Sequence, residues 1–388
     1  MERILLGQLG SNGDCLYATA VARQIKLDHP KAHLTWAIAD LTRDSVRHLP
    51  YVDEWWEFPV RDFAEMERAW FRFEREAWAR HGTGEFTRLV MTQIWPGNMR
   101  HFDGTVRPSL YRGYPGRITD PAIAHIHLTD EERERVDAWV AEMVAPRGNR
   151  VCLVECFAKS GQSFMTPALA QAVAERVTAV VPDCVVILST HLPVVSDNPR
   201  ILWGGHLSIR QTAHLTHHID LFMGCGSGLT VAATSSAAKA DIPLIQVLEA
   251  STSVFGSFRH DFDYWGRPSE QFLETTARDT DILADIVVTV LRDGLIAAKA
   301  AFDQPQFLQF SWYRHLITEV LLRRSRFVEA AQSWLLTSDR YGAVAELRDF
   351  ARNEILPRLA EDPLSDCAHR RAQLERFRNL CSNQSQEG

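Results

Sequence analysis

The sequence has no excess of basic residues, no long apolar run and no regular pattern of cysteines. Its 42 Lys and Arg face 49 Asp and Glu, for a net charge of −7, so the protein-wide positive field typical of nucleic-acid-binding proteins is absent. No stretch of about 18 uncharged apolar residues is present to span a bilayer, and residues 1–7 lack the basic and apolar regions of a secretory signal. The seven cysteines are irregularly spaced and do not suggest a disulfide framework. We therefore expect a cytoplasmic protein with no nucleic-acid partner, which meets a membrane only at its surface.

The sequence does have the composition of a globular protein and a repeating strand–helix pattern. Its 388 residues, 46% hydrophobic and 23% charged, correspond to two or three domains at about 150 residues each. Buried strands are expected near residues 3–9, 33–39 and 52–58, and a linker at 146–149. The pattern then restarts with strands near 150–157, 185–189, 219–223 and 243–248 and helices over 167–180, 209–217 and 229–240. This alternation predicts parallel sheets with right-handed crossovers, in Rossmann-like domains over 1–146 and 150–298 that face a cleft.

A third part, residues 302–381, is expected to be a helical extension. Trp312, Leu316, Val320 and Phe327 recur near helical spacing and predict a helix over 312–327. We expect these helices to dock on the body of the protein or on another subunit, which would make a homo-oligomer. A helix lying on an anionic membrane surface is the alternative.

The first candidate site is the glycine-rich turn from Gly7 to Asp14. Glycines between a strand and a helix let the backbone approach a ligand closely. Asp14 is either a helix cap or a catalytic carboxylate, and the helix dipole would hold its pKa low. The G-x-x-G-x-x-G spacing differs from the dinucleotide fingerprint. An NAD site with Asp40 as the ribose-binding acid nevertheless stays open.

The second candidate site is the turn from Gly224 to Thr230, between a strand and a helix. Three glycines, two hydroxyls and free backbone N–H groups at a helix start suit a phosphate or diphosphate. The loop from Ala158 to Ser163 also follows a strand, where open α/β sheets bind ligands. A lysine there, Lys159, would neutralise a diphosphate. The alternatives are a tight turn without a ligand and a solvated lysine.

Two groups of residues in the sequence could be metal ligands, one of histidines and one of cysteines. His214, His217 and His218 have helical spacing, but no acidic or cysteine partner is evident from the sequence, so we expect no metal. Cys152 and Cys156 lack a second cysteine pair and are expected to be buried thiols.

The residues Ile4 to Asp14, Thr19 and the helix end at His29-Pro30 resemble the opening of the ADP-heptose:lipopolysaccharide heptosyltransferases, glycosyltransferase family nine. The stretch Pro50 to Glu54 resembles an element of that family. His218 to Thr230, with Ala232-Ala233 and Ile242-Pro243, resembles its donor-binding segment. The resemblance spans residues 1–250 with gaps.

The resemblance implies a GT-B fold and a metal-independent, inverting glycosyltransferase with no cofactor. Asp14 would be the general base, and the acceptor would bind mainly to the first domain, at Gly10, Ser11, Asn12 and Gly13. The second domain would bind the nucleotide-sugar, through Lys159, Ser160, Gln162, Ser163, Gly224, Gly226, Ser227, Gly228, Leu229 and Thr230. The acceptor would be a surface glycan or its lipid-linked precursor, met at the inner face of the plasma membrane.

The donor segment departs from the family pattern at three places. Gly226 stands where the family has Asp, and Val231 stands where it has His. The family's lysine has no counterpart beyond Lys159, a few residues earlier. Other enzymes of this fold (a sugar-nucleotide epimerase or hydrolase), an NAD-dependent oxidoreductase and a non-catalytic GT-B-like binding module remain alternatives.

Overall fold

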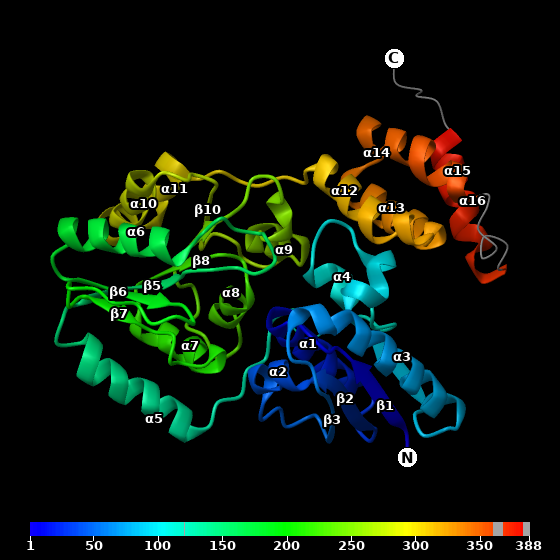
Figure 1. Ribbon diagram of the computed structural model, residues 1–388, viewed down its shortest axis with the longest axis horizontal. Coiled ribbons are helices and arrows are strands. Elements are labelled where there is room, and N and C mark those ends of the chain that lie inside the picture. Colours follow the sequence, from blue (N-terminus) through cyan, green and yellow to red (C-terminus); the bar gives the residue numbers. More distant parts are fainter. Residues whose placement is uncertain (120, 360–367, 383–388) are drawn as a thin grey trace.

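The computed structural model describes residues 1–119, 121–359 and 368–382. Two parallel sheets organise the chain (Figure 1). The first has the order β3-β2-β1-β4 and the second the order β10-β9-β8-β5-β6-β7. Within each sheet all paired strands run parallel.

The first half contains the four-stranded sheet and the helices around it. Its strands are β1 (Arg3–Gly7), β2 (His33–Ala39), β3 (Glu54–Phe58) and β4 (Arg88–Met91). Its helices are α1 (Asn12–Asp28), α2 (Asp40–Arg43), α3 (Met66–Gly82) and α4 (Arg107–Tyr111), with short helical turns η1 (Asp44–Val46), η2 (Phe63–Glu65), η3 (Ile94–Asn98) and η4 (Met99–His101).

The second half contains the six-stranded sheet. Its strands are β5 (Arg150–Glu155), β6 (Cys184–Ser189), β7 (Ile201–Trp203), β8 (Leu221–Gly224), β9 (Leu244–Val247) and β10 (Phe272–Thr275). Its helices are α6 (Pro167–Val180), α7 (Ile209–Leu215), η6 (Thr216–His218), α8 (Gly228–Ala233), η7 (Ser253–Phe255), α9 (Phe258–Tyr264), α10 (Thr280–Asp293) and α11 (Leu295–Phe302).

The helix α5 (Asp130–Trp139), continued by η5 (Val140–Val144), precedes the predicted linker but packs on the second half. It begins with the predicted capping box, in which Thr129 Oγ1 accepts from the Glu132 N–H at 3.3 Å. It contacts α7, and Glu132 is paired with Arg210 of that helix. We infer that the second half begins nearer Thr129 than Arg150.

The two halves share one apolar core. Buried side chains of α1 and β1, such as Leu16 and Leu6, belong to the same cluster as Leu153 of β5 and Phe222 of β8. The first turns of α1 and α8 pack directly on each other. The carboxyl ends of β1 and β8, which lead into these helices, are therefore brought to one place.

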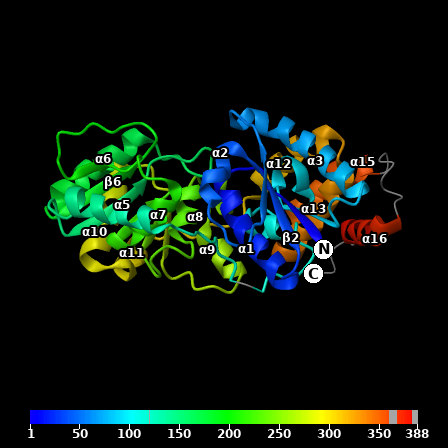
Figure 2. The ribbon, with the colours of Figure 1, turned by 90° about the horizontal axis from the view of Figure 1, so that it is seen from below.

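The C-terminal extension consists of helices only. They are α12 (Phe310–Val320), η8 (Leu322–Arg324), α13 (Phe327–Tyr341), α14 (Ala345–Phe350), η9 (Ala351–Ile355), α15 (Leu356–Leu359) and α16 (Ala368–Ser382). Figures 1 and 2 both place them beside the first half. Tyr313 and Trp334 share a core with Met99 and Phe102 of the body, so the predicted docking on the body is confirmed.

Two predicted helices have different bounds. The prediction of one continuous helix over 312–327 was wrong. The helix α12 ends at Val320, and Ser325 adopts a left-handed conformation with φ 56° before α13 begins. The helix expected over 229–240 is only six residues long, α8. It ends at Thr234, where the backbone leaves the helical conformation with φ −116° and ψ 14°.

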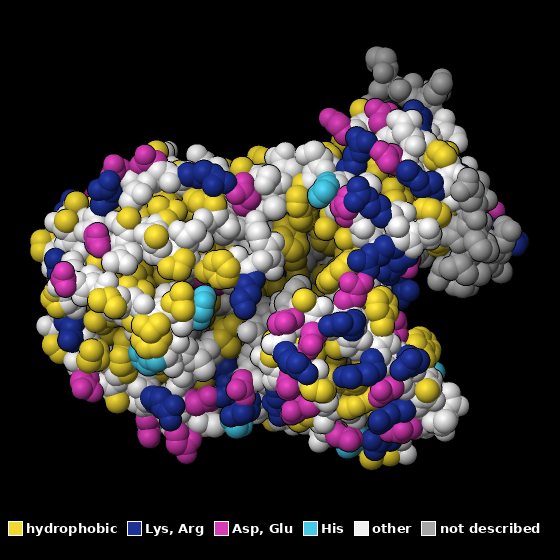
Figure 3. Space-filling model, in the orientation of Figure 1, with side chains coloured by type: hydrophobic (Ala, Val, Ile, Leu, Met, Phe, Trp, Pro, Cys, Tyr) yellow, Lys and Arg dark blue, Asp and Glu magenta, His cyan; other side chains and the backbone are white. Residues whose placement is uncertain are grey.

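Side chains of both charges are interspersed over the face shown in Figure 3. Among the described residues, no helix is both long enough and apolar enough to cross a membrane. All six cysteines in the described part of the chain are free thiols, and all are buried.

Candidate active site

The turn after β1 places Asp14 in the first turn of α1. One carboxylate oxygen, Oδ2, accepts hydrogen bonds from the Ser11 backbone N–H at 3.3 Å and the Ser11 hydroxyl at 3.5 Å. The preceding backbone is held by Gln93, whose Oε1 accepts from the N–H groups of Leu9 at 2.7 Å and Gly10 at 3.1 Å. The turn is therefore held by buried side-chain contacts, with Asp14 serving at least as a cap.

The surroundings of Asp14 set its proton affinity. Burial raises its pKa to about 6, while the hydrogen bonds from Ser11 lower it. The low pKa expected from the helix dipole is therefore wrong, because desolvation outweighs the dipole and the cap. The carboxylate is still mostly ionised at pH 7. A pKa this close to neutrality suits a group that takes up a proton.

The second glycine-rich turn is braced by a carboxylate that sequence reasoning missed. Glu155 ends β5 and is 3% exposed. Its Oε2 accepts from the Cys225 N–H at 2.7 Å and the Thr230 hydroxyl at 2.7 Å, and its Oε1 accepts from the Ser227 hydroxyl. Burial raises its pKa, and the hydrogen bonds from Ser227, Cys225 and Thr230 oppose that rise. An acidic residue at the end of an otherwise apolar strand was the available signal.

This brace uses groups that were predicted to face a phosphate. The Thr230 hydroxyl is fully buried and also accepts from the Gly226 N–H at 3.1 Å. The backbone N–H groups of Cys225 and Leu229 point to Glu155. Ser227 and Gly228 remain partly exposed at the start of α8.

The predicted loop over 158–163 lies against this turn. Gln162 is buried, and its amide nitrogen donates to the Gly226 carbonyl at 3.1 Å. Its amide oxygen is buried without a hydrogen-bond partner. Ser163 is partly buried beside Cys225. Lys159 and Ser160 are exposed, and Lys159 makes no ion pair among the described residues.

The two glycine motifs touch each other. A Cβ on Gly13 would lie 3.3 Å from the Gly228 Cα, and a Cβ on Gly228 would lie 3.2 Å from the Gly13 backbone nitrogen. Both glycines therefore allow the first turns of α1 and α8 to approach. Close packing of the two halves accounts for Gly228, in addition to any ligand contact.

The departures from the family pattern have structural reasons. Gly226 has φ 69°, and a Cβ there would lie 2.5 Å from the Gly256 carbonyl oxygen, so an aspartate does not fit. Val231 is 2% exposed and belongs to the core shared by the halves. The carboxylate that binds the donors of this turn is Glu155, which comes from β5 and not from the turn.

The other residues singled out in the sequence have local roles. Asp40 is exposed at the start of α2, and its Oδ1 accepts from the N–H groups of Leu41 at 2.8 Å and Val60 at 3.0 Å. Cys152 and Cys156 are buried thiols, as expected.

A cavity of about 700 Å³ lies away from the predicted site residues. Its lining includes Tyr111, Arg112 and Arg117 of the first half and Trp265 and Arg267 of the second.

Comparison with solved structures identifies the fold. A glycosyltransferase family 9 protein from Veillonella parvula DSM 2008 superposes with a TM-score of 0.51 at 12% identity, covering 76% of this chain and 97% of that one. The ADP-heptose lipopolysaccharide heptosyltransferase II of E. coli gives a TM-score of 0.49 at 13% identity, covering 76% and 99%. A UDP-N-acetylglucosamine 2-epimerase gives 0.47 at 10% identity, covering 82% and 96%.

The likeness to the Veillonella structure places the chain in the GT-B type of fold, as its N-terminal motif led us to expect. At the level of structure it is similar to the family-nine glycosyltransferases. No protein-family model and no curated protein sequence matches the chain.

Proposed function

We propose that the chain is an inverting, metal-independent glycosyltransferase that moves a sugar from a nucleotide-sugar to a glycan or lipid-linked glycan, with Asp14 as the general base. The observation that carries the proposal is the position of Asp14. This partly buried carboxylate, with a pKa of about 6, lies where the first turn of α1 meets the Gly224–Thr230 turn of the second half. An inverting transfer needs a proton acceptor within reach of the attacking hydroxyl.

In the proposed step, Asp14 takes the proton of an acceptor hydroxyl while the oxygen of that hydroxyl attacks the anomeric carbon of the donor sugar. The bond from that carbon to the diphosphate oxygen breaks, and the nucleoside diphosphate leaves with the electron pair. Attack opposite to the leaving group inverts the anomeric configuration. Residues 10–13 would bind the acceptor.

The leaving group would be stabilised from the second half. Lys159 is exposed in the loop beside the turn and makes no ion pair with any described residue, and Ser227 and Gly228 are accessible at the start of α8. Positive charge and N–H groups aimed at a departing diphosphate lower the barrier because the negative charge develops there. Gln162 would orient the turn through its bond to Gly226.

A second candidate is a GT-B-like module that binds a ligand without catalysis. Glu155 favours it, because a buried carboxylate already accepts the N–H groups of Cys225 and Leu229 that would otherwise cradle a phosphate. The NAD-dependent alternative has less support, since Asp40 Oδ1 already accepts from the N–H groups of Leu41 and Val60.

A ligand screen followed by a turnover assay tests the proposal. Thermal shift with ADP-, UDP-, GDP-, CMP- and NAD-type ligands identifies the donor class, because a ligand that binds the folded state raises its melting temperature. Release of nucleoside diphosphate from the matching nucleotide-sugar is then measured with an acceptor glycan. Asp14→Asn should abolish release and keep nucleotide binding.

Asp130→Asn is the matched control, because Asp130 also lies in the first turn of a helix, α5, but is exposed. Turnover by Asp14→Asn at the rate of this control would exclude Asp14 as the base. Nucleotide binding with no turnover in the wild type would favour the binding module.

A further inference from the structure

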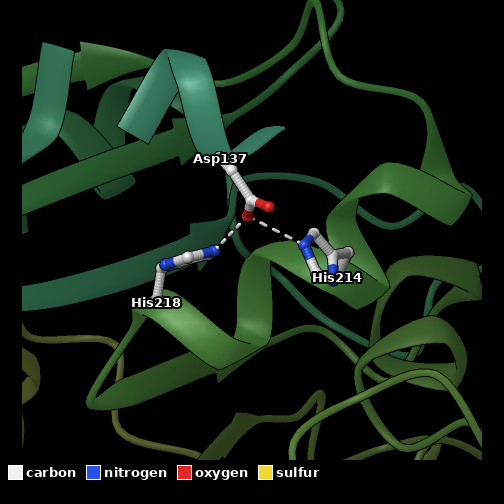
Figure 4. Close-up of side chains that lie close together, drawn as sticks. All are labelled: Asp137, His214 and His218. Atoms are coloured by element: carbon white, nitrogen blue, oxygen red, sulfur yellow. Dashed lines mark hydrogen bonds and ion pairs between the residues drawn. The ribbon is translucent and has the colours of Figure 1, made fainter. Parts of the chain in front are cut away.

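The fold brings together three side chains with the chemistry of a transition-metal site. His214 on α7 and His218 on η6 both direct their Nε2 atoms to one oxygen of Asp137 on α5 (Figure 4). The distances from Asp137 Oδ1 are 2.9 Å to His214 Nε2 and 2.7 Å to His218 Nε2. The three ligand atoms all lie within 4.8 Å of one another. The sequence alone shows no acidic partner for these histidines, because Asp137 lies far from them along the chain.

We propose that Asp137, His214 and His218 bind one divalent transition-metal ion of the zinc class. Two imidazole nitrogens and one carboxylate oxygen are ligands that Zn²⁺ prefers, whereas Ca²⁺ and Mg²⁺ prefer oxygen ligands alone. Zinc–ligand bonds of about 2.0–2.1 Å in tetrahedral geometry separate neighbouring ligand atoms by about 3.3 Å. The distances from Asp137 Oδ1 to the two imidazole Nε2 atoms therefore need to increase by only about 0.5 Å to admit an ion.

The site is accessible from solvent. The side chains of Asp137, His214 and His218 are 50%, 16% and 30% exposed, so an ion can reach them and a water can complete the coordination.

The ion would fasten α5 to the end of α7. These two helices are already joined by the pair between Glu132 and Arg210, and the opposite end of α7 contacts Gly228 through Ile209. The site lies on the helical surface of the second half and shares no residue with the proposed transfer site. Its role is therefore to stabilise α5 on this half, independently of the reaction.

His217 provides a matched control on the same turn. Its Nε2 contacts the Ala237 carbonyl oxygen at 3.1 Å, and the residue is not among the three clustered ligands. Replacing it removes an imidazole whose ring centre lies 5.5 Å from that of His214, but it removes none of the three proposed ligands.

Zinc titration by calorimetry on the full chain, freed of any histidine tag and of metal, tests the site. We expect the wild type and His217→Ala to bind one equivalent of Zn²⁺, and Asp137→Asn and His218→Ala to lose at least tenfold in affinity. Co²⁺ added to the wild type should give the visible absorption of a four-coordinate ion, and Asp137→Asn should not. Excess Mg²⁺ should not displace Zn²⁺.

The isosteric Asp137→Asn decides the outcome if His218→Ala does not fold. Absence of saturable binding by the wild type would overturn the proposal. So would a loss of affinity in His217→Ala as large as that in Asp137→Asn. Neither readout depends on turnover, so the result is independent of the glycosyltransferase proposal.

Discussion

At the scale of single residues, Asp14 combines a capping role with the proton affinity expected of a base. Its pKa of about 6 predicts that transfer falls as the pH drops below about 6, because the protonated carboxyl cannot accept a proton. A pH–rate profile of kcat/KM measures this acidic limb. An acidic limb below pH 4.5 would show that a group other than Asp14 sets the pH dependence of the reaction.

The same pKa predicts the effect of Asp14 on stability. The folded-state pKa of about 6 lies above the ordinary value of 3.8, so the stability contributed by this group is fully present below about pH 4 and lost as the pH rises through 6. Asp14→Asn removes this titration. At pH 7 we therefore expect the variant to unfold at a temperature equal to or above that of the wild type, measured by thermal denaturation. A clear loss of stability would mean that the cap outweighs the cost of burying the charge.

Glu155 is the other residue whose charge decides local structure. Replacing Glu155 with glutamine removes the negative charge. It also places an N–H₂ group beside the groups that donate to Glu155, namely the Cys225 N–H and the hydroxyls of Ser227 and Thr230. We expect Glu155→Gln to lower the free energy of unfolding by about 1–3 kcal/mol, because buried donors lose their acceptor. It should also tighten nucleotide diphosphate binding, since a negative charge beside the phosphates is removed.

Denaturant titration and calorimetry measure the two effects of Glu155→Gln. Glu175→Gln on the exposed face of α6, where the Glu175 carboxylate accepts from the Gln171 amide at 3.3 Å, is the control. A Glu155→Gln variant as stable as Glu175→Gln would contradict the bracing role.

At the scale of elements, the β8–α8 turn needs glycine at position 226 for two reasons that can be separated. Gly226 and Gly161 both have left-handed backbones, with φ 69° and 75°. A Cβ on Gly226 would lie 2.5 Å from the Gly256 carbonyl oxygen, whereas a Cβ on Gly161 would have nothing within 4 Å. Gly161→Ala should therefore cost only the conformational penalty of about 1–2 kcal/mol.

Gly226→Ala should cost at least about 1 kcal/mol more than Gly161→Ala, because the backbone at Gly256 must move. Thermal or denaturant unfolding of the two variants measures the difference. Equal losses would show that the clash is relieved without cost. A larger loss for Gly226 would explain why this chain has no aspartate at the position where the family it resembles has one.

The elements also show what the sequence could predict. Strands with uninterrupted apolar runs, such as β5 and β2, and the capped helix α5 were found because burial and capping act locally. The strands β4, β7 and β10, of three or four residues each, were not predicted. Glu155 was missed as the brace of the second turn, since its contacts are made to residues about 70 positions later. The pairing of Asp137 with two histidines depends likewise on how α5 docks.

At the scale of the whole molecule, Arg340 joins all three parts of the chain. It lies on α13 of the extension, and its Nη1 donates to Asp103 Oδ2 at 2.9 Å and to Thr105 Oγ1 at 2.7 Å in the first half. Its guanidinium carbon is 4.1 Å from the ring centre of Tyr264 in the second half. The extension therefore packs as part of the folded body, and its removal would leave Asp103 with fewer partners.

Arg340→Ala tests this coupling. Asp103 is fully buried. Burial would raise its pKa, but the charges of Arg112 and Arg340 hold it below its ordinary value. Such a group contributes stability above its unfolded pKa, and that stability is lost as the pH falls through the folded pKa. We expect Arg340→Ala to lower the free energy of unfolding by about 3 kcal/mol at pH 7, because a buried ion pair loses one partner.

The variant should also lose stability at a higher pH than the wild type as the solution is acidified. Without Arg340, only Arg112 lowers the pKa of Asp103, so that pKa is higher. Thermal unfolding across a pH series measures both effects. Arg323→Ala is the matched control, because Arg323 pairs with Glu319 on the exposed surface of the same extension, where such pairs contribute about 0–1 kcal/mol. If the two variants follow the same pH–stability curve, the Arg340–Asp103 pair does not hold the extension on the body. The shared apolar core around Phe102 and Tyr313 would then account for the docking by itself.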